Sequence, residues 1–332
     1  MMKKKKVLIT GVAGFVGSNL ATELINRGYE VIGVDDLSHG SLRNIEIFLK
    51  HDLFHFVQGD VCNKSIIMEK AHDVDYIVHL AAFKIPRYGN ALKTLMVNSK
   101  GTENILEISR EQGCKVVFSS TSDIYGKNPS LPFSEESDLV LGQTRVKRWG
   151  YAVSKIFDEH LCFAYHEEFG VPLTIVRYFG GYGPGQHLSW RGGPQPVFID
   201  CALRKQPLPI HGTGQQKRCF TYISDMVEGT IKAMESEAAN GEVFNIGNSF
   251  EVSILTLATE IWNLIYPHEK PPIEFISYES FSGKYEDVMR RIPDMEKAKK
   301  ILNFEAKIDL KEGLTQTIEW QKQVTTAVPK IS

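Results

Sequence analysis

The segment VLITGVAGFVG, Val7 to Gly17, indicates how this chain begins to fold. It is an apolar, β-branched run that breaks at three glycines and then continues as a helix-compatible pattern to Gly28. Gly11 permits a tight turn, Gly14 lets the backbone approach a phosphate, and Gly17 lets the helix pack close to the strand. A strand, a glycine turn and a helix in this order predict a pocket in which a pyrophosphate meets the positive end of the helix.

A second strand-like run, Val31 to Val34, ends at Asp35, eighteen residues past Gly17. An acid at this spacing fits the hydroxyls of a ribose. Its carboxylate would also repel a 2′-phosphate, and no arginine directly follows it. The pattern therefore predicts NAD rather than NADP as the cofactor, against the competing interpretation of a glycine turn in some other α/β protein.

The composition is that of an ordinary globular protein. The chain has 332 residues, 42% of them apolar, and a net charge of −2, which allows one large α/β domain plus a smaller lobe. Lysine and arginine are scattered, so no nucleic-acid surface is expected, and no apolar run approaches the length of a membrane span. We interpret the MMKKKK start as a solubilising lead-in and expect a soluble cytoplasmic protein.

Five cysteines without CxxC spacing argue against a disulfide framework and against a zinc site. We therefore expect buried thiols and no metal. The cysteines are Cys62, Cys114, Cys162, Cys201 and Cys219.

Strand-like runs alternate with helical patterns through the first half of the chain, which predicts an α/β fold with a Rossmann-type, doubly wound parallel sheet. These runs are Lys5 to Thr10, Glu30 to Val34, Phe54 to Gln58, Tyr76 to Leu80, Lys115 to Ser119 and Leu173 to Tyr178. A long loop, GGYGPGQHLSWRGGPQP, then begins at Gly180, and such loops often line a ligand. We expect residues 1–180 to form the NAD-binding domain and residues 181–332 to form mainly a substrate-binding lobe, with a frayed end from Val324.

Tyr151 and Lys155 lie four residues apart in a segment with helical periodicity, so both project from one helix face. An ammonium beside a phenol stabilises phenolate. We therefore expect a lowered pKa for Tyr151, which would make it a candidate base for a substrate hydroxyl. A YxxxK spacing also occurs by chance on solvated helix faces, but here it follows a complete nucleotide-binding pattern.

With these residues in place, the chain resembles the extended short-chain dehydrogenase/reductase superfamily, and within it the NAD-dependent nucleotide-sugar epimerases, dehydratases and decarboxylases. The likeness covers nearly the whole length. Besides the glycine turn and YxxxK, the shared motifs are DDLSHG (35–40), GDV (59–61), HLAA (79–82), NSKGT (98–102), SSTSDIYG (119–126), RYFGGYGPGQ (177–186) and KRCFTYISD (217–225).

The resemblance implies a set of functional residues. Those for the cofactor are Gly11, Gly14, Phe15, Val16, Gly17, Asp35, Asp36, Ser38, Gly40, Asp60, Val61, Leu80, Ala81, Ala82, Lys84, Asn98, Tyr151, Lys155 and Tyr178. Those for the nucleotide sugar are Lys84, Thr121, Gly180, Arg218 and Arg291, and those for catalysis are Thr121, Ser122, Asp123, Tyr151, Lys155 and Arg291. For several of these positions, structural turns and strand ends are the competing interpretation.

The family chemistry implied by the resemblance is transient oxidation at C4 of the sugar, with Tyr151 accepting the O4 proton. The resulting ketone permits decarboxylation of a C6 carboxylate, dehydration, or reduction from the other face. Asp123 stands where decarboxylases and dehydratases place an acid, although decarboxylases usually carry glutamate there. RWGYAVSK (148–155), YEDVMRRIPD (285–294) and ALKTLMVN (91–98) resemble the decarboxylase branch, in which the arginine corresponding to Arg291 approaches the sugar carboxylate.

We therefore expect a UDP-glucuronate decarboxylase, with a 4-epimerase or a 4,6-dehydratase as alternatives. A noncatalytic NAD-binding module and a net dehydrogenase acting on a hydroxylated small molecule remain open. Two departures bear on the substrate: Gly180 replaces the family's asparagine, and the SWRGG segment at Ser189 to Gly193 is atypical. Relatives pair two helices across a dimer, and apolar faces on the Tyr151 helix and on Thr94 to Arg110 lead us to expect a homodimer.

Overall fold

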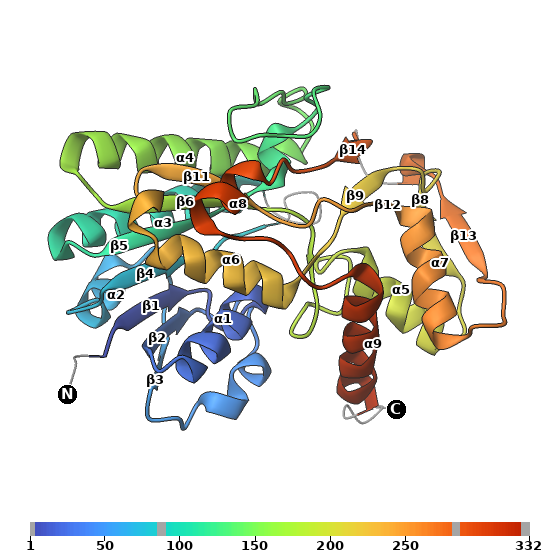
Figure 1. Ribbon diagram of the computed structural model, residues 1–332, viewed down its shortest axis with the longest axis horizontal. Helices are drawn as coiled ribbons and strands as arrows, with labels where there is room; N and C mark the ends of the chain where they lie inside the picture. The colour runs from blue at the N-terminus through green and yellow to red at the C-terminus, as the bar shows by residue number, and fades with distance from the viewer. Residues whose placement is uncertain (1–3, 85–90, 281–285, 327–332) are drawn as a thin grey trace.

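A seven-stranded sheet forms the larger of two lobes in the computed structural model, which describes residues 4–84, 91–280 and 286–326. Figure 1 shows this lobe beside a smaller one built mainly from the second half of the chain. All six predicted strands are present. The strands of the sheet are β1 (Lys6–Thr10), β2 (Glu30–Asp35), β3 (Phe54–Gln58), β4 (Tyr76–His79), β5 (Lys115–Thr121), β6 (Leu173–Tyr178) and β11 (Glu242–Ile246).

Every pairing in this sheet is parallel, and the strand order is β11-β6-β5-β4-β1-β2-β3. The chain first builds outward from β1 to β3 and then continues on the other side of β1 with β4. Loops at the carboxyl ends of β1 and β4 therefore diverge, and this switch point is where open α/β sheets bind ligands. The predicted Rossmann-type fold is confirmed.

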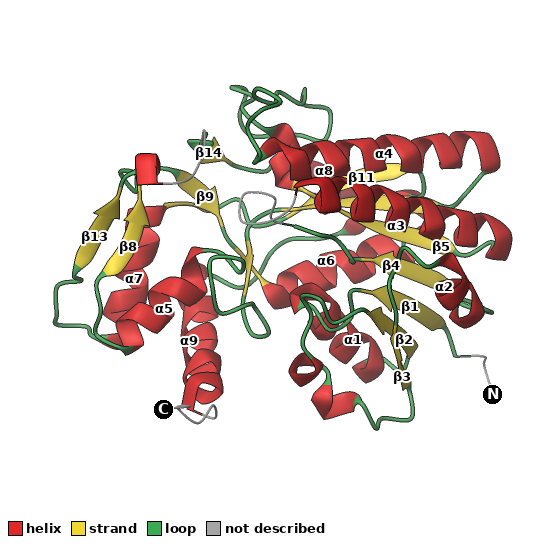
Figure 2. Ribbon diagram, turned by 180° about the vertical axis from the view of Figure 1, so that it is seen from behind, coloured by secondary structure: helices red, strands yellow, loops and turns green. Residues whose placement is uncertain are grey.

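Helices cover both faces of the sheet. The helices α1 (Phe15–Asn26) and α6 (Ile223–Glu235) pack together on one face. The other face carries α2 (Lys64–Lys70), α3 (Ala91–Gln112) and α4 (Trp149–Phe169), of which α3 and α4 lie side by side in Figure 2.

Alternation along the buried strands divides the core between these two faces. In β1, Val7 and Ile9 join the core under α1 and α6, whereas Leu8 joins the core under α3 and α4. All three side chains are inaccessible to solvent. The core therefore fixes how the carboxyl ends of the strands are aligned, and with them the loops of the site.

The smaller lobe consists of short strands against three helices. A parallel pair joins β8 (Leu208–His211) to β13 (Ile273–Ile276), and a three-stranded sheet orders β12 (Glu251–Ser253), β9 (Lys217–Cys219) and β14 (Arg290–Arg291). The helices are α5 (Pro194–Leu203), α7 (Ile254–Ile265) and α9 (Leu310–Thr326).

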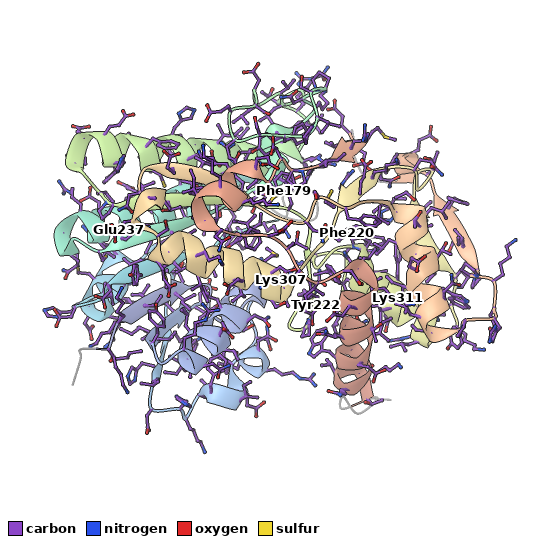
Figure 3. The ribbon with its side chains drawn as sticks, in the orientation of Figure 1. Phe179, Phe220, Tyr222, Glu237, Lys307 and Lys311 are labelled. Carbon is purple, nitrogen blue, oxygen red and sulfur yellow. The ribbon has the colours of Figure 1, made fainter. Side chains whose placement is uncertain are left out.

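The chain passes between the lobes more than once. The short pair β7 (Gly181–Tyr182) and β10 (Thr221–Tyr222) leads into α6, and β11 then completes the large sheet beside β6. The helix α8 (Glu296–Leu302) packs on β11 and α6. Tyr222 donates a hydrogen bond to Gln316 of α9, and Figure 3 shows it below Phe220 where the lobes meet. Residues 223–246 thus belong to the larger lobe, although they follow the boundary expected at residue 180.

Two sequence expectations fall partly outside the described residues: Tyr285 of the decarboxylase-like segment, and the frayed end beyond Thr326. The first three residues of the expected fraying, Val324 to Thr326, are the last turn of α9. In the described part of the chain, no helix has the length and apolar character needed to cross a membrane.

Candidate active site

The glycine turn after β1 lies at the switch point and leaves no room for side chains. Gly11 has a φ of +74°, and a Cβ there would lie 2.9 Å from the backbone nitrogen of Ala81, which follows β4. A Cβ on Gly17 would overlap the carbonyl oxygen of Gly11. Gly14 precedes the first residues of α1, Phe15 and Val16, so the amino end of this helix is open to an anionic group.

Asp35 at the end of β2 holds this turn in place. One carboxylate oxygen accepts a hydrogen bond of 2.9 Å from Ala13 N–H, and the other accepts one of 2.8 Å from Leu37 N–H. A Cβ on Gly40 would lie 2.7 Å from Asp35 Oδ1. Burial raises the pKa of Asp35. Close backbone approach, a helix amino terminus and an acid at the end of β2 together fit a dinucleotide.

The other residues expected near the cofactor gather around the same carboxyl edge. Asn98 of α3 links three segments, because it accepts from Phe83 N–H at 2.7 Å and donates to Ser154 of α4 at 2.9 Å. Asp36 and Asp60 each accept a hydrogen bond from a backbone N–H two residues later. The remaining positions are Ser38 in the loop after β2, Val61 in the turn after β3, Leu80, Ala81, Ala82 and Lys84 after β4, and Tyr178 at the end of β6, bonded to Thr230.

Tyr151 and Lys155 project from the first turns of α4 toward the end of β5, as the spacing predicts. Lys155 is 1% exposed, donates a hydrogen bond of 2.7 Å to the carbonyl oxygen of Ser119, and lies over the Phe118 ring. The expected lowering of the Tyr151 pKa is wrong for this structure. Burial raises that pKa above its ordinary value, the Asp123 and Asp158 carboxylates raise it further, and the Thr121 hydroxyl opposes them.

The turn that follows β5 carries the next catalytic candidates. Thr121 ends the strand and accepts a hydrogen bond of 3.2 Å from Asp123 N–H, so it caps the short 3₁₀ helix of Ser122–Tyr125. Arg291 of β14 reaches this turn from the other lobe: its guanidinium lies 2.6 Å from Asp123 Oδ1 and donates to Ser122 Oγ at 3.3 Å. The structure therefore brings Thr121, Ser122, Asp123 and Arg291 together.

Asp123 is ionised at neutral pH although it is partly buried. Desolvation alone would raise its pKa, but the charges of Arg291 and Arg148 outweigh it and hold the pKa well below the ordinary range of a carboxyl group. The Arg148 guanidinium lies 3.6 Å from the same Asp123 oxygen.

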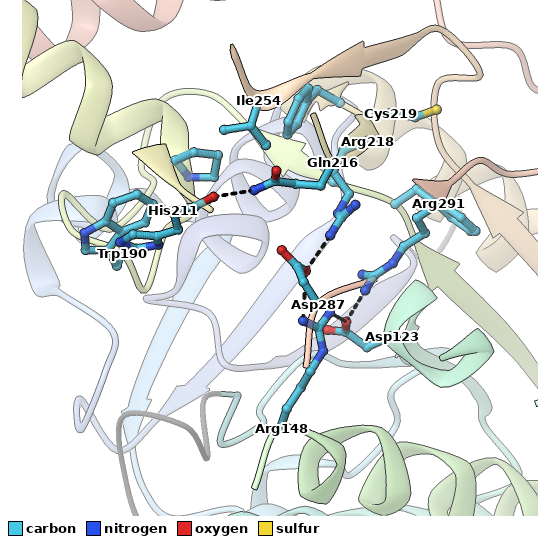
Figure 4. Close-up of a pocket in the computed structure, with 15 residues that line it drawn as sticks. Asp123, Arg148, Trp190, His211, Gln216, Arg218, Cys219, Ile254, Asp287 and Arg291 are labelled. Atoms are coloured by element: carbon cyan, nitrogen blue, oxygen red, sulfur yellow. Dashed lines mark hydrogen bonds and ion pairs between the residues drawn. The ribbon is translucent and has the colours of Figure 1, made fainter. Parts of the chain in front are cut away.

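A second carboxylate, Asp287, continues this series of alternating charges. Its Oδ1 lies 3.2 Å from Arg148 and 3.0 Å from Arg218, and its Oδ2 accepts a hydrogen bond of 2.6 Å from Tyr278. Figure 4 shows the three guanidiniums and two carboxylates converging along one wall of a pocket of about 260 Å³. Three positive and two negative charges leave this wall with a net positive charge, which favours an anionic ligand.

The sequence analysis did not single out Arg148 or Asp287 as site residues. Arg148 stands three residues before Tyr151, the spacing that places two residues on one helix face, and this signal could have identified it. Asp287 comes from a loop without periodicity, and its role depends on the approach of β9 and β14.

Aromatic side chains line the far end of the pocket, and one of them, Trp190, comes from the atypical segment after Gly180. Trp190 stacks on His211 of β8, with ring centroids 4.2 Å apart and an angle of 28° between the planes. Gly180 lines the pocket with a φ of +50°, and a Cβ on it would overlap the carbonyl oxygen of Cys219. The backbone thus occupies the space that a side chain at this position would need.

Comparison with known proteins gives one family. Residues 7–247 match the model of the NAD dependent epimerase/dehydratase family. A UDP-N-acetyl-alpha-D-glucosaminuronate decarboxylase of Bacillus cytotoxicus is 38% identical over 324 residues, which cover 97% of this chain and 99% of that protein. UDP-glucuronic acid decarboxylase 1 of Xenopus tropicalis is 35% identical over 96% of this chain and 72% of its own length.

Comparison with solved structures also finds similarity over nearly the whole chain. The UDP-glucuronic acid 4-epimerase of Bacillus cereus, in complex with UDP-glucuronic acid and NAD, superposes with a TM-score of 0.85 at 31% identity. The match covers 96% of this chain and 99% of the epimerase. Both decarboxylases and epimerases are therefore similar to this chain over almost all of its length.

Proposed function

The chain belongs to the NAD-dependent epimerase/dehydratase family, and from that premise we propose that it decarboxylates a UDP-linked uronic acid, with UDP-glucuronate as the first candidate. The observation that carries the choice of reaction is the contact of 2.6 Å between Arg291 and Asp123 beside the pocket. The Arg291 guanidinium can bind the carboxylate of a uronic acid, and the ionised Asp123 carboxylate holds that guanidinium in place. The two decarboxylases named above support the same choice.

NAD held at the glycine turn and Asp35 would supply the hydride acceptor and donor for C4 of the sugar. Tyr151 takes the O4 proton as C4 becomes a ketone and returns it when C4 is reduced. Lys155 lies one helical turn away, and its ammonium favours the phenolate while the proton is away. The Thr121 hydroxyl assists, because its interaction with Tyr151 lowers the phenol pKa.

The ketone makes the C6 carboxylate a β-keto acid, which loses carbon dioxide as the C5–C6 bond breaks. The electron pair of that bond moves into C4–C5 and leaves negative charge on O4. Arg291 binds the carboxylate before the bond breaks and stabilises the enolate afterwards. Asp123 orients Arg291, and its ionised carboxylate holds the water molecule that delivers a proton to C5.

The diphosphate and the base of the substrate extend away from the sugar. Arg218, whose charged end lies between Asp287 and Lys217 O, grips the diphosphate. The aromatic pair Trp190 and His211 receives the base at the far end of the pocket. Lys84 and the backbone of Gly180 complete the sugar contacts.

Product analysis tests the reaction directly. The NAD-bound protein is incubated with UDP-glucuronate, its 2-acetamido analogue and UDP-glucose, and products are read by mass. We expect loss of carbon dioxide from a uronate and, in heavy water, one deuterium at C5 of the product. Unchanged mass with inverted C4 would instead identify an epimerase, loss of water a dehydratase, and no turnover of any substrate would exclude all three activities.

We also propose a homodimer formed through α3 and α4. Both helices expose large apolar side chains to solvent: Leu92 and Met96 on α3, and Val153 and Phe157 on α4. Exposed apolar side chains on two adjacent helices support association with a second copy. A cytoplasmic location is consistent with the five cysteines, all of which are free thiols.

A further inference from the structure

A buried carboxyl group, Asp158, lies on α4 beside the catalytic pair and has no part in the mechanism above. Its side chain is inaccessible to solvent, neither carboxylate oxygen accepts a well-formed hydrogen bond within the described part of the chain, and the nearby Thr102 hydroxyl lowers its pKa. A carboxyl group buried in this way costs stability. Such costs are concentrated at sites where they serve chemistry.

Helical spacing brings Asp158 into line with the catalytic residues. It follows Lys155 by three residues, and Lys155 follows Tyr151 by four, so the three side chains lie along one face of α4. Burial lowers the pKa of Lys155, and the Asp158 carboxylate opposes that effect more than any other charge. The same carboxylate raises the pKa of Tyr151. Asp158 therefore acts on both partners of the proposed proton exchange.

The groups that face Asp158 from neighbouring elements do not take its place. His79 of β4 lies beside the Thr102 hydroxyl, at 3.4 Å, and is bonded to Thr10 at 2.7 Å; burial together with the Lys155 charge lowers its pKa to about 3, so it is neutral. From α3 comes the uncharged hydroxyl of Thr102, and from α4 the buried thiol of Cys162.

Glu159, the other acid of this part of α4, is already neutralised. Its two oxygens lie 2.7 and 3.0 Å from the Arg177 guanidinium of β6. Glu159 still raises the pKa of Lys155, but Asp158 raises it more.

We propose that Asp158 is a positioning residue: it balances the buried charge of Lys155 and thereby sets the pH range over which Tyr151 exchanges the O4 proton. This inference rests on the proposed function, because it takes Tyr151 as the base. The negative charge of ionised Asp158 stabilises the ammonium form of Lys155, and protonation of Asp158 removes that stabilisation. Burial raises the pKa of Asp158 to about 6, so both forms are accessible near neutral pH.

The test compares the pH profiles of kcat for the wild-type enzyme and Asp158→Asn, with NAD and the uronate that is turned over. Without the negative charge, Tyr151 loses its proton more easily and Lys155 gives up its ammonium form sooner. Both limbs of the profile should therefore move to lower pH, by roughly one unit. A folded variant with unmoved limbs overturns the proposal.

Glu159→Gln is the matched control, since it removes the same charge one residue later. We expect it to lower the melting temperature, because Arg177 loses its partner, and to move the limbs less than Asp158→Asn does, because Glu159 raises the pKa of Lys155 less than Asp158 does. If Asp158→Asn does not fold, Asp158→Ser removes the charge with a smaller side chain and is measured in the same way.

A titration without turnover separates this inference from the proposed function. In NAD-bound protein labelled with ¹³Cζ-tyrosine, the Tyr151 signal is assigned by its loss in Tyr151→Phe. Its apparent pKa should be lower in Asp158→Asn than in the wild type, and equal values would overturn the proposal. A protein that turns over no uronate but shows this shift would contradict the proposed function alone.

Discussion

Arg291 and Asp123 form an ion pair of 2.6 Å that joins β14 of the smaller lobe to the turn after β5 of the larger one. The two residues lie 168 positions apart in the sequence, so the pair depends on the complete fold. Because the charges of Arg291 and Arg148 hold Asp123 ionised, this contact delivers a fixed cation and a fixed anion to the same wall of the pocket. The proposed decarboxylation uses both.

Replacing Arg291 should abolish most of the decarboxylation. We expect Arg291→Gln to lower kcat/KM for the uronate by about a hundredfold or more, since a charged donor to the carboxylate and the enolate is lost. Arg290→Gln is the matched control, because Arg290 is exposed and pairs with Glu251 on the other side of β14. Equal losses in the two variants would contradict the role of Arg291.

Removing the Tyr151 hydroxyl should stop turnover while NAD remains bound. General acid–base catalysis contributes about 10²–10⁴-fold, so Tyr151→Phe should lose at least that factor in kcat. Tyr165→Phe is the control on the same helix, because its hydroxyl donates to Glu107, away from the pocket. Calorimetry reports NAD affinity for both variants, and full activity in Tyr151→Phe would exclude the proposed base.

Asp158→Asn should stabilise the protein at high pH. The folded-state pKa of Asp158, about 6, exceeds its ordinary value of 3.8, so ionisation costs folding free energy as pH rises between the two. That cost is complete above the folded pKa and amounts to roughly 3 kcal/mol at most. In urea unfolding, the variant should have a higher free energy of unfolding than the wild type at pH 8 and the same value at pH 3. A difference that does not change with pH would contradict the raised pKa of Asp158.

Gly180 should tolerate no side chain without a loss of stability. Gly180→Ala places a Cβ against the carbonyl oxygen of Cys219 and adds the strain of a positive φ. Gly170→Ala is the control, because Gly170 has a φ of +69° and open space around its Cβ position, so it bears only the strain of about 1–2 kcal/mol. Denaturant unfolding should show a clearly larger loss for Gly180→Ala.

The expected homodimer depends on the exposed apolar side chains of α3 and α4. Phe157→Glu places a charge on that surface and should give a monomer in gel filtration and light scattering. Phe275→Glu is the control, because Phe275 is also exposed but lies on β13 of the other lobe. A wild-type protein that is already monomeric, or a dimer unaffected by Phe157→Glu, would contradict this interface.

Six strands and the glycine turn could be predicted because each depends on local patterns. Buried parallel strands are continuous apolar runs, and Gly11 and Gly17 are required by backbone geometry alone. The seventh strand, β11, was missed, since VFNI is short and its pairing with β6 bridges a long excursion through the smaller lobe. Such a pairing leaves no mark on neighbouring residues.

The site was predictable where residues act through helix spacing or family motifs, as for Tyr151, Lys155 and Asp123. Asp287 could not be predicted, because its importance comes from Arg148 and Arg218, which approach it from α4 and β9. The prediction of a lowered pKa for Tyr151 was wrong for a related reason. Spacing shows that an ammonium is near, but only the structure shows how strongly burial and Asp123 act in the opposite direction.

The pairing of β11 with β6 determines how this protein can be divided. A fragment that stops at residue 180 would keep the glycine turn and Tyr151 but would leave the apolar strand Leu173–Tyr178 as an open edge. Unpaired edges of this kind recruit strands from other molecules. An isolated amino-terminal half should therefore aggregate instead of binding its dinucleotide, and any useful truncation must retain the chain as far as Ile246.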